Sequence, residues 1–268
     1  MKKLAFLIFL LGALLSGTNL RAQDADDKFY TSFDGTKIYY EVKGDGFPVI
    51  MVHGFTGTSQ GWKRGALYGD LLKQGYKVII LDQRGNGKSD KPHTDEGYNN
   101  DAEAKDIMGL ATSLGIKKYN VVGYSRGSII VSRLLILDKK RLNKAVMGGM
   151  GDDYTNPEWP RRIHAYKALM GDTSMHDVDD MMVWIRKNNF DNLALAYQQK
   201  YQPSTSKQEL AKVKIPVLLV DGTEDKTNGS EIKLNHAIPG SVLKYVPGDH
   251  NSAGNSIQFS AAVTTFFK

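Results

Sequence analysis

The sequence predicts an α/β fold: a doubly wound, mostly parallel sheet with antiparallel N-terminal strands and an inserted helical cap. Three observations predict it. Short apolar runs alternate with segments of helical length, which is typical of a parallel sheet covered on both faces. An Asp-Gly pair between two β-rich runs near the N-terminus indicates an antiparallel hairpin. Residues 151–210 show helical patterns without strand patterns, so they interrupt the alternation.

The first 22 residues are typical of a secretory signal peptide. Lys2 and Lys3 form a basic start, residues 4–15 are almost entirely apolar, and Ala22 precedes an acidic stretch. The apolar run is shorter than the roughly 20 residues of a membrane-spanning helix. We therefore expect cleavage near Ala22, export to the periplasm or the medium, and no stable membrane anchor after cleavage. An uncleaved anchor is the alternative.

The predicted elements follow one another in a regular order. The hairpin joins strands over 29–33 and 37–42 around Asp34-Gly35. Apolar runs predict further strands over 48–53, 76–81, 118–122, 144–150, 215–220 and 241–246. Helices are predicted over 101–114, 128–137 and 229–237, with a closing helix around Phe259–Phe266.

Residues 151–210 are expected to form the cap, inserted between the core segments 23–150 and 211–268. Three cap helices are predicted, one starting at Asn156-Pro157, one over 177–187 and one over 192–201.

The cap holds two of the three tryptophans and four of the nine methionines. Adaptable methionine and aromatic side chains suit the walls of a ligand cavity, although most of them hold a cap to its core. Trp159 and Trp184 of the cap, together with Tyr124, are the candidates for a substrate pocket.

Composition excludes several function classes. Removal of Lys2, Lys3 and Arg21 lowers the net charge from +6 to +3, which is too small to indicate nucleic acid or an anionic membrane as a partner. The chain has no cysteine, so a thiol nucleophile and a cysteine-ligated metal are excluded. It has no His-Glu-x-x-His and no phosphate-binding lysine loop, so we expect no metal, nucleotide or flavin cofactor.

Residues 123–127, Gly-Tyr-Ser-Arg-Gly, stand between a predicted strand and a predicted helix. A turn that lifts the Ser125 hydroxyl clear of a sheet is strained, so glycine is needed at positions 123 and 127. The helix start behind it offers free N–H groups and partial positive charge to an oxyanion. Ser125 is therefore the candidate nucleophile; the alternative is a glycine-rich turn with a surface serine.

With this turn, the sequence resembles the α/β-hydrolase family. Two other motifs carry the resemblance: His53-Gly54 after one apolar strand, and Asp82-x-Arg84-Gly-x-Gly-x-Ser after the next. The resemblance implies mainly structural roles for Asp82 and Arg84. We expect His53 to brace its loop.

The resemblance also implies an oxyanion hole made by the backbone N–H groups of Phe55 and Arg126. Arg126 stands where many relatives carry a smaller or apolar residue. Its guanidinium either points away into a carboxylate or adds a charge to the site, and both possibilities stay open from the sequence.

Ser125, Asp225 and His250 follow the order of the family's Ser-Asp-His triad, and each comes after a predicted strand. A serine hydroxyl needs a base within hydrogen-bond reach, and that base needs a third group to hold its tautomer. His250 is the expected base. Asp221 and Glu224 are the competing carboxylates, but the spacing and shorter reach favour Asp225.

We therefore expect a serine hydrolase that cleaves small to medium carboxylic esters through an acyl-Ser125 intermediate. C–C bond hydrolysis and cofactor-free perhydrolysis by the same triad are the alternatives within the fold. A ligand-binding protein with a vestigial triad is the alternative from another class.

Overall fold

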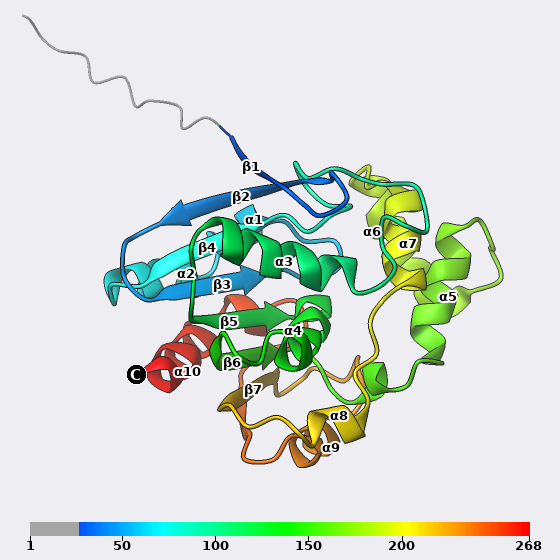
Figure 1. Ribbon diagram of the computed structural model, residues 1–268. Coiled ribbons are helices and arrows are strands. Elements are labelled where there is room, and N and C mark those ends of the chain that lie inside the picture. The colour runs from blue at the N-terminus through cyan, green and yellow to red at the C-terminus, as the bar shows by residue number, and fades with distance from the viewer. Residues whose placement is uncertain (1–26) are drawn as a thin grey trace, which may run out of the picture.

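An eight-stranded sheet forms the centre of the molecule (Figure 1). The structure is a computed structural model that describes residues 27–268, so the predicted signal peptide, residues 1–22, lies outside the described part. The strands are β1 (Lys28–Thr31), β2 (Lys37–Lys43), β3 (Pro48–Val52), β4 (Lys77–Leu81), β5 (Tyr119–Tyr124), β6 (Leu142–Gly148), β7 (Val217–Gly222) and β8 (Val242–Val246).

The strand order across the sheet is β1-β2-β4-β3-β5-β6-β7-β8. β1 pairs antiparallel with β2 and β2 antiparallel with β4, while every later pair is parallel. The predicted fold class, a mostly parallel sheet with antiparallel N-terminal strands, is confirmed.

Each face of the sheet has its own hydrophobic core. Along β3, Ile50 and Val52 belong to one core and Val49 and Met51 to the other, because successive side chains of a strand point to opposite faces. Both faces are covered, which is why the strands are continuously apolar rather than alternating.

Helices cover both faces. They are α1 (Ser59–Trp62), α2 (Ala66–Lys73), α3 (Ala102–Ser113), α4 (Arg126–Leu137), α9 (Glu231–Ala237) and α10 (Ile257–Phe267). α3, α4 and α9 pack on one core, and α1, α2 and α10 pack on the other. No helix within residues 27–268 combines the length and apolar character needed to cross a bilayer.

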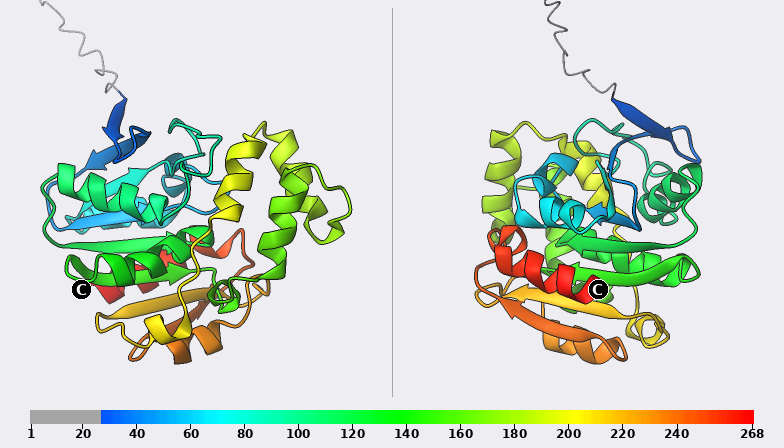
Figure 2. Two further views of the ribbon diagram at one scale, coloured as in Figure 1. Left: turned by 45° about the vertical axis from the view of Figure 1, so that its right-hand side comes forward. Right: turned by 90° about the vertical axis from the view of Figure 1, so that its left-hand side faces the viewer.

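The segment between β6 and β7 is helical. It contains η1 (Asp153–Thr155), α5 (Pro160–Leu169), η2 (His176–Val178), α6 (Asp179–Lys187), α7 (Asn192–Lys200) and α8 (Lys207–Leu210). α5, α6 and α7, which we call the cap helices, lie beyond the carboxyl ends of the parallel strands (Figures 1 and 2). They share a small apolar core of their own that includes Leu169, Ile185 and Leu195.

Two details of this segment differ from the sequence-based expectation. The first cap helix begins at Pro160, not at Asn156-Pro157, because Pro160 occupies the first helical turn, where a missing N–H is tolerated. Leu210 of α8 packs into the core beneath the sheet with α4 and α9, not into the cap core.

Arg84 lies fully buried in the loop after β4 and fixes that loop. Its Nε and Nη2 donate to Asp106 of α3 at 2.7 and 2.6 Å, its Nη1 donates to Asp34 of the hairpin turn at 2.7 Å, and it also donates to the Gly97 carbonyl. Replacement of one partner would leave the other charge buried and unpaired.

We predict that Arg84→Met lowers the free energy of unfolding by about 3 kcal/mol or more, because Asp106 would lose its charge partner. Lys88→Met is the matched control: Lys88 pairs with Asp27 on the surface, so its loss is expected to cost less than about 1 kcal/mol. Urea unfolding of both variants measures the difference. Equal, small losses would contradict a structural role for Arg84.

Candidate active site

The turn at Ser125 joins β5 to α4 with a strained backbone. Ser125 has φ 53° and ψ −126°, in a region that residues other than glycine rarely adopt. A Cβ at position 123 would overlap the carbonyl of Gly127, and a Cβ at position 127 would overlap the carbonyl of Val52. The Ser125 N–H donates to the Gly148 carbonyl at 2.8 Å and holds the turn against β6.

The structure brings Ser125, His250 and Asp225 together from three separate loops. His250 Nε2 lies 2.9 Å from Ser125 Oγ, and His250 Nδ1 lies 2.6 Å from Asp225 Oδ2. The Tyr124 hydroxyl donates to the His250 carbonyl at 2.8 Å, and its ring packs beside the imidazole. Such an arrangement can transfer a proton from the hydroxyl to the imidazole.

Of the three neighbouring carboxylates, Asp225 faces the imidazole. Its side chain is buried, which opposes ionisation most strongly, but bonds from His250 and from the N–H and hydroxyl of Thr227 outweigh burial and lower the pKa of Asp225 to about 2. Glu224 is exposed at the surface.

Asp221 is buried at the end of β7, where its Oδ1 accepts from the Gly222 N–H at 2.9 Å. Burial, followed by the charge of Asp225, raises the pKa of Asp221 to about 7. Asp221 therefore tends to the neutral form when Asp225 is ionised, so it adds little negative charge beside the imidazole.

The predicted oxyanion hole lies where the loop after β3 meets the start of α4. A Cβ built on Gly54 would come within 3.3 Å of Ser125 Cβ, so the loop passes directly over the serine. In the described part of the chain, the N–H groups of Phe55 and Arg126 have no acceptor. Both donors are therefore free for an oxygen held beside Ser125.

The side chain of Arg126 points away from the site into a carboxylate. Its Nη1 and Nη2 donate to the two Glu103 oxygens at 2.6 and 2.5 Å, and Nη2 also donates to the Gln198 carbonyl of α7 at 3.0 Å. Arg126 and Glu103 are both buried. The geometry decides between the two possibilities that the sequence leaves open for this guanidinium.

His53 braces its loop. It is buried, its Nε2 accepts from the Gln83 N–H at 3.0 Å, and its Nδ1 lies 2.7 Å from the Gly54 carbonyl. Burial lowers the pKa of His53, so the ring is neutral with its proton on Nδ1. His53 thus shapes the loop and does not face Ser125.

A cavity of about 80 Å³ adjoins Ser125 and His250. We call it the inner cavity; Trp159, Met150 and Met181 are among the apolar residues that line it. The structure does not bring the other two pocket candidates to it. Tyr124 lies behind His250, packed on Phe259.

Trp184 lies on the outer side of α6 with 51% of its surface exposed. α6 turns Met182 and Ile185 inward to the cap core instead.

Sequence reasoning missed several residues around the triad. Asn228 donates to the Gly149 carbonyl at 3.1 Å and lies 3.5 Å from His250 Nδ1. Glu103 and Gln198 hold Arg126. Of these contacts, only those of Arg126 could have been anticipated from the sequence, because a buried guanidinium requires a buried acceptor. Within residues 27–268, no group of three or more histidine, aspartate or glutamate side chains is placed to hold a metal ion.

Comparison with known proteins supports this description. The family model of the alpha/beta hydrolase fold matches residues 48–178. A non-heme chloroperoxidase of Streptomyces lividans is 36% identical over 120 residues, which cover 44% of this chain and 42% of that protein. The chain thus spans less than half the length of that relative.

Two longer matches are less similar in sequence. A 2-hydroxy-6-oxononadienedioate/2-hydroxy-6-oxononatrienedioate hydrolase of Pseudomonas putida is 24% identical, with 77% of this chain and 82% of that protein aligned. The solved structure of an esterase from Exiguobacterium antarcticum superimposes with a TM-score of 0.75 at 23% identity, covering 90% of this chain and 98% of that one. Fold, motif order and family match agree, and the chain belongs to the α/β-hydrolase fold family.

Proposed function

We propose that this protein is a serine hydrolase that cleaves carboxylic esters with small acyl groups through an acyl-Ser125 intermediate. The observation that carries the proposal is the continuous hydrogen-bonded series from Ser125 Oγ through His250 to Asp225, at 2.9 and 2.6 Å. A nucleophile, a base and an orienting carboxylate in contact are what acyl transfer to serine requires.

In the proposed reaction each group has one role. Ser125 Oγ attacks the ester carbonyl as His250 Nε2 takes the hydroxyl proton, and the N–H groups of Phe55 and Arg126 stabilise the tetrahedral oxyanion. His250 then gives the proton to the departing alcohol. Water, activated by His250 in the same way, releases the acid and restores Ser125.

Asp225 fixes the imidazole in the productive tautomer. Because its pKa is about 2, Asp225 is a carboxylate at neutral pH and accepts a hydrogen bond from the Nδ1–H of His250. The lone pair of Nε2 is then directed at Ser125, and the imidazolium formed during attack is stabilised.

The inner cavity limits the acyl group. At about 80 Å³ the cavity is small beside the roughly 300–1,000 Å³ of common ligand pockets, so it favours a short acyl chain. Trp159 and Met181 are apolar parts of its lining.

Perhydrolysis is the second candidate, and the similarity to a non-heme chloroperoxidase favours it. Hydrogen peroxide would replace water in attack on the acyl-enzyme and would release a peracid. The similarity to the Pseudomonas putida hydrolase supports C–C bond hydrolysis in the same way. Three assays rank the reactions: ester hydrolysis without peroxide, peracid formation from the ester with peroxide, and cleavage of the 2-hydroxy-6-oxononadienedioate in the name of the Pseudomonas putida relative.

We predict that Ser125→Ala lowers kcat/KM for p-nitrophenyl acetate by about 10³-fold or more, because the nucleophile is lost. Its melting temperature should stay close to that of the wild type, and a fluorophosphonate probe should label Ser125 alone in the wild-type protein. Retained activity in the variant would end the covalent mechanism. Absence of turnover in the wild type would favour a ligand-binding protein with a vestigial triad.

We predict that Asp225→Asn lowers kcat by roughly 10⁴-fold, because an amide at this position favours the wrong tautomer of His250. Asp221→Asn and Glu224→Gln are the matched controls and should stay within roughly tenfold of the wild type. Measurement of kcat for the three variants decides which carboxylate acts. A large loss at Asp221 or Glu224, with Asp225→Asn near normal, would reassign the acid.

We predict that kcat/KM for p-nitrophenyl acetate and butyrate exceeds that for the octanoate by at least about tenfold, a difference of about 1.4 kcal/mol in transition-state binding. The reason is the small volume of the inner cavity. A series of p-nitrophenyl esters of increasing chain length measures it. Highest activity on the octanoate would show that the cap helices open far more than the structure indicates.

A further inference from the structure

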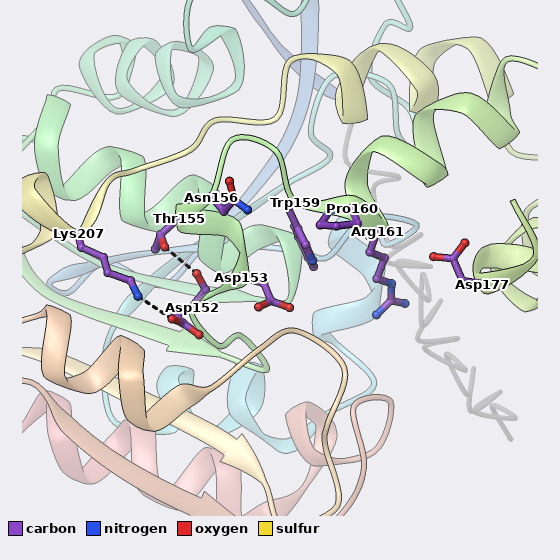
Figure 3. A pocket seen from close by; sticks show the side chains of 9 residues that line it. All are labelled: Asp152, Asp153, Thr155, Asn156, Trp159, Pro160, Arg161, Asp177 and Lys207. Carbon is purple, nitrogen blue, oxygen red and sulfur yellow. Dashed lines mark hydrogen bonds and ion pairs between the residues drawn. The ribbon is translucent and has the colours of Figure 1, made fainter.

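A second, larger cavity of about 450 Å³ lies next to the inner cavity, lined by residues of η1, the start of α5, η2 and α8 (Figure 3). We call it the outer cavity. Trp159 and Arg161 line both cavities, so the two cavities are neighbours. An ester whose acyl group occupies the inner cavity would extend its alcohol part into the outer one.

Some of the charged groups around the outer cavity are already paired with one another. Lys207 Nζ lies 2.8 Å from Asp152, which also accepts from the Ser230 N–H at 3.0 Å. Asp177 lies 3.0 Å from His164. These residues shape the wall, and Lys207 balances the charge of Asp152.

Two polar side chains keep free hydrogen-bonding capacity. Asp153 is half-buried; burial, followed by the charge of Asp152, raises the pKa of Asp153, while a hydrogen bond from Trp159 opposes this rise. Arg161 Nη1 donates to the Thr227 carbonyl at 3.0 Å, and the Arg161 side chain lines the cavity. Figure 3 shows Asp153, Trp159 and Arg161 turned toward the same space.

This lining discriminates between ligand classes. An anion would meet the carboxylates of Asp152, Asp153 and Asp177, and a cation would meet Arg161 and Lys207. An apolar group would desolvate these charges without giving them hydrogen bonds, which is costly. A neutral polyol fits, because each hydroxyl both donates to a carboxylate and accepts from a guanidinium. Trp159, which is 9% exposed, adds apolar surface to the same lining.

We propose that the outer cavity binds the alcohol part of the substrate, and that this part is a neutral, hydroxyl-rich ring such as a sugar. The substrate would be a sugar that carries a short acyl ester. This inference rests on the ester hydrolysis proposed above. In the acylation step the bond from the acyl carbon to the sugar oxygen breaks, the acyl carbon bonds to Ser125 Oγ, and His250 returns its proton to the departing sugar oxygen.

Two acetates with the same acyl group test the inference: methyl glucoside acetylated at its primary hydroxyl, and cyclohexylmethyl acetate, which has a ring of similar size but no hydroxyls. The wild type should show kcat/KM at least about tenfold higher for the sugar ester. Asp153→Asn should lower the ratio of the two kcat/KM values by at least about fivefold, because hydrogen bonds to a charged acceptor are lost. Arg161→Gln is the second variant and should lower the ratio in the same direction.

Glu158→Gln is the matched control, because Glu158 is an exposed carboxylate of the same segment that does not line the cavity; the ratio should stay within about twofold of the wild type. Cleavage of both acetates with equal kcat/KM, and with no change of the ratio in either variant, would overturn the inference and leave the esterase function intact.

If the wild type cleaves neither acetate, calorimetric titration of Ser125→Ala with the acetylated glucoside separates the two proposals. Binding that Asp153→Asn weakens would support a sugar site in a protein without esterase activity. Absence of binding would overturn the inference as well.

Discussion

The strained backbone at Ser125 is the constraint on which the rest of the site depends. A serine at φ 53° costs on the order of 1–3 kcal/mol, so the surrounding structure must fix it. It does so through the bond from the Ser125 N–H to the Gly148 carbonyl and through the close approach of α4 to β3, which only glycine at position 127 allows. In return, the hydroxyl stands clear of the sheet, at the start of a helix and at the carboxyl ends of the parallel strands, where loops from several strands can reach it.

Buried polar groups connect this turn to the cap helices. Arg126, the residue after the nucleophile, joins α4 to Glu103 of α3 and to the Gln198 carbonyl of α7. The Gln198 side chain in turn donates to the Arg84 carbonyl and to Asn86 Oδ1, both at 2.6 Å. One set of contacts therefore holds three parts together: the loop that Arg84 fixes, the turn at Ser125 and the cap helix α7. Loss of either charge of the Arg126–Glu103 pair would leave the other buried and unpaired.

Much of the fold could be predicted from the sequence, because the strands are buried on both faces and so form unbroken apolar runs. The Asp34-Gly35 turn likewise marked the antiparallel start. Trp184 does not reach the pocket because it lies on the exposed side of α6, away from the apolar face that the helical spacing marks. Val178, Met182 and Ile185 define the inward side of this segment, and Trp184 does not share it.

Other features depend on contacts between distant segments. The sequence around Glu103 does not indicate that Glu103 pairs with Arg126. The hydrogen bond from Asn228 to the Gly149 carbonyl likewise forms only when the two loops come together in the fold. The outer cavity is also a tertiary feature, since its lining comes from η1, α5, η2 and α8. Motif order can indicate a triad, but the shape of the space around it arises only when the cap helices pack on the core.

The central claim, that chemistry passes through a covalent bond to Ser125, is tested most directly by trapping the intermediate. Wild-type protein mixed with excess p-nitrophenyl acetate and quenched in acid within the first turnovers should yield, by peptide mass mapping, one acetyl group on the peptide that contains Ser125. The same modification should accumulate in Asp225→Asn more slowly. Turnover of the ester with no acetylated Ser125 peptide at any quench time would contradict the account.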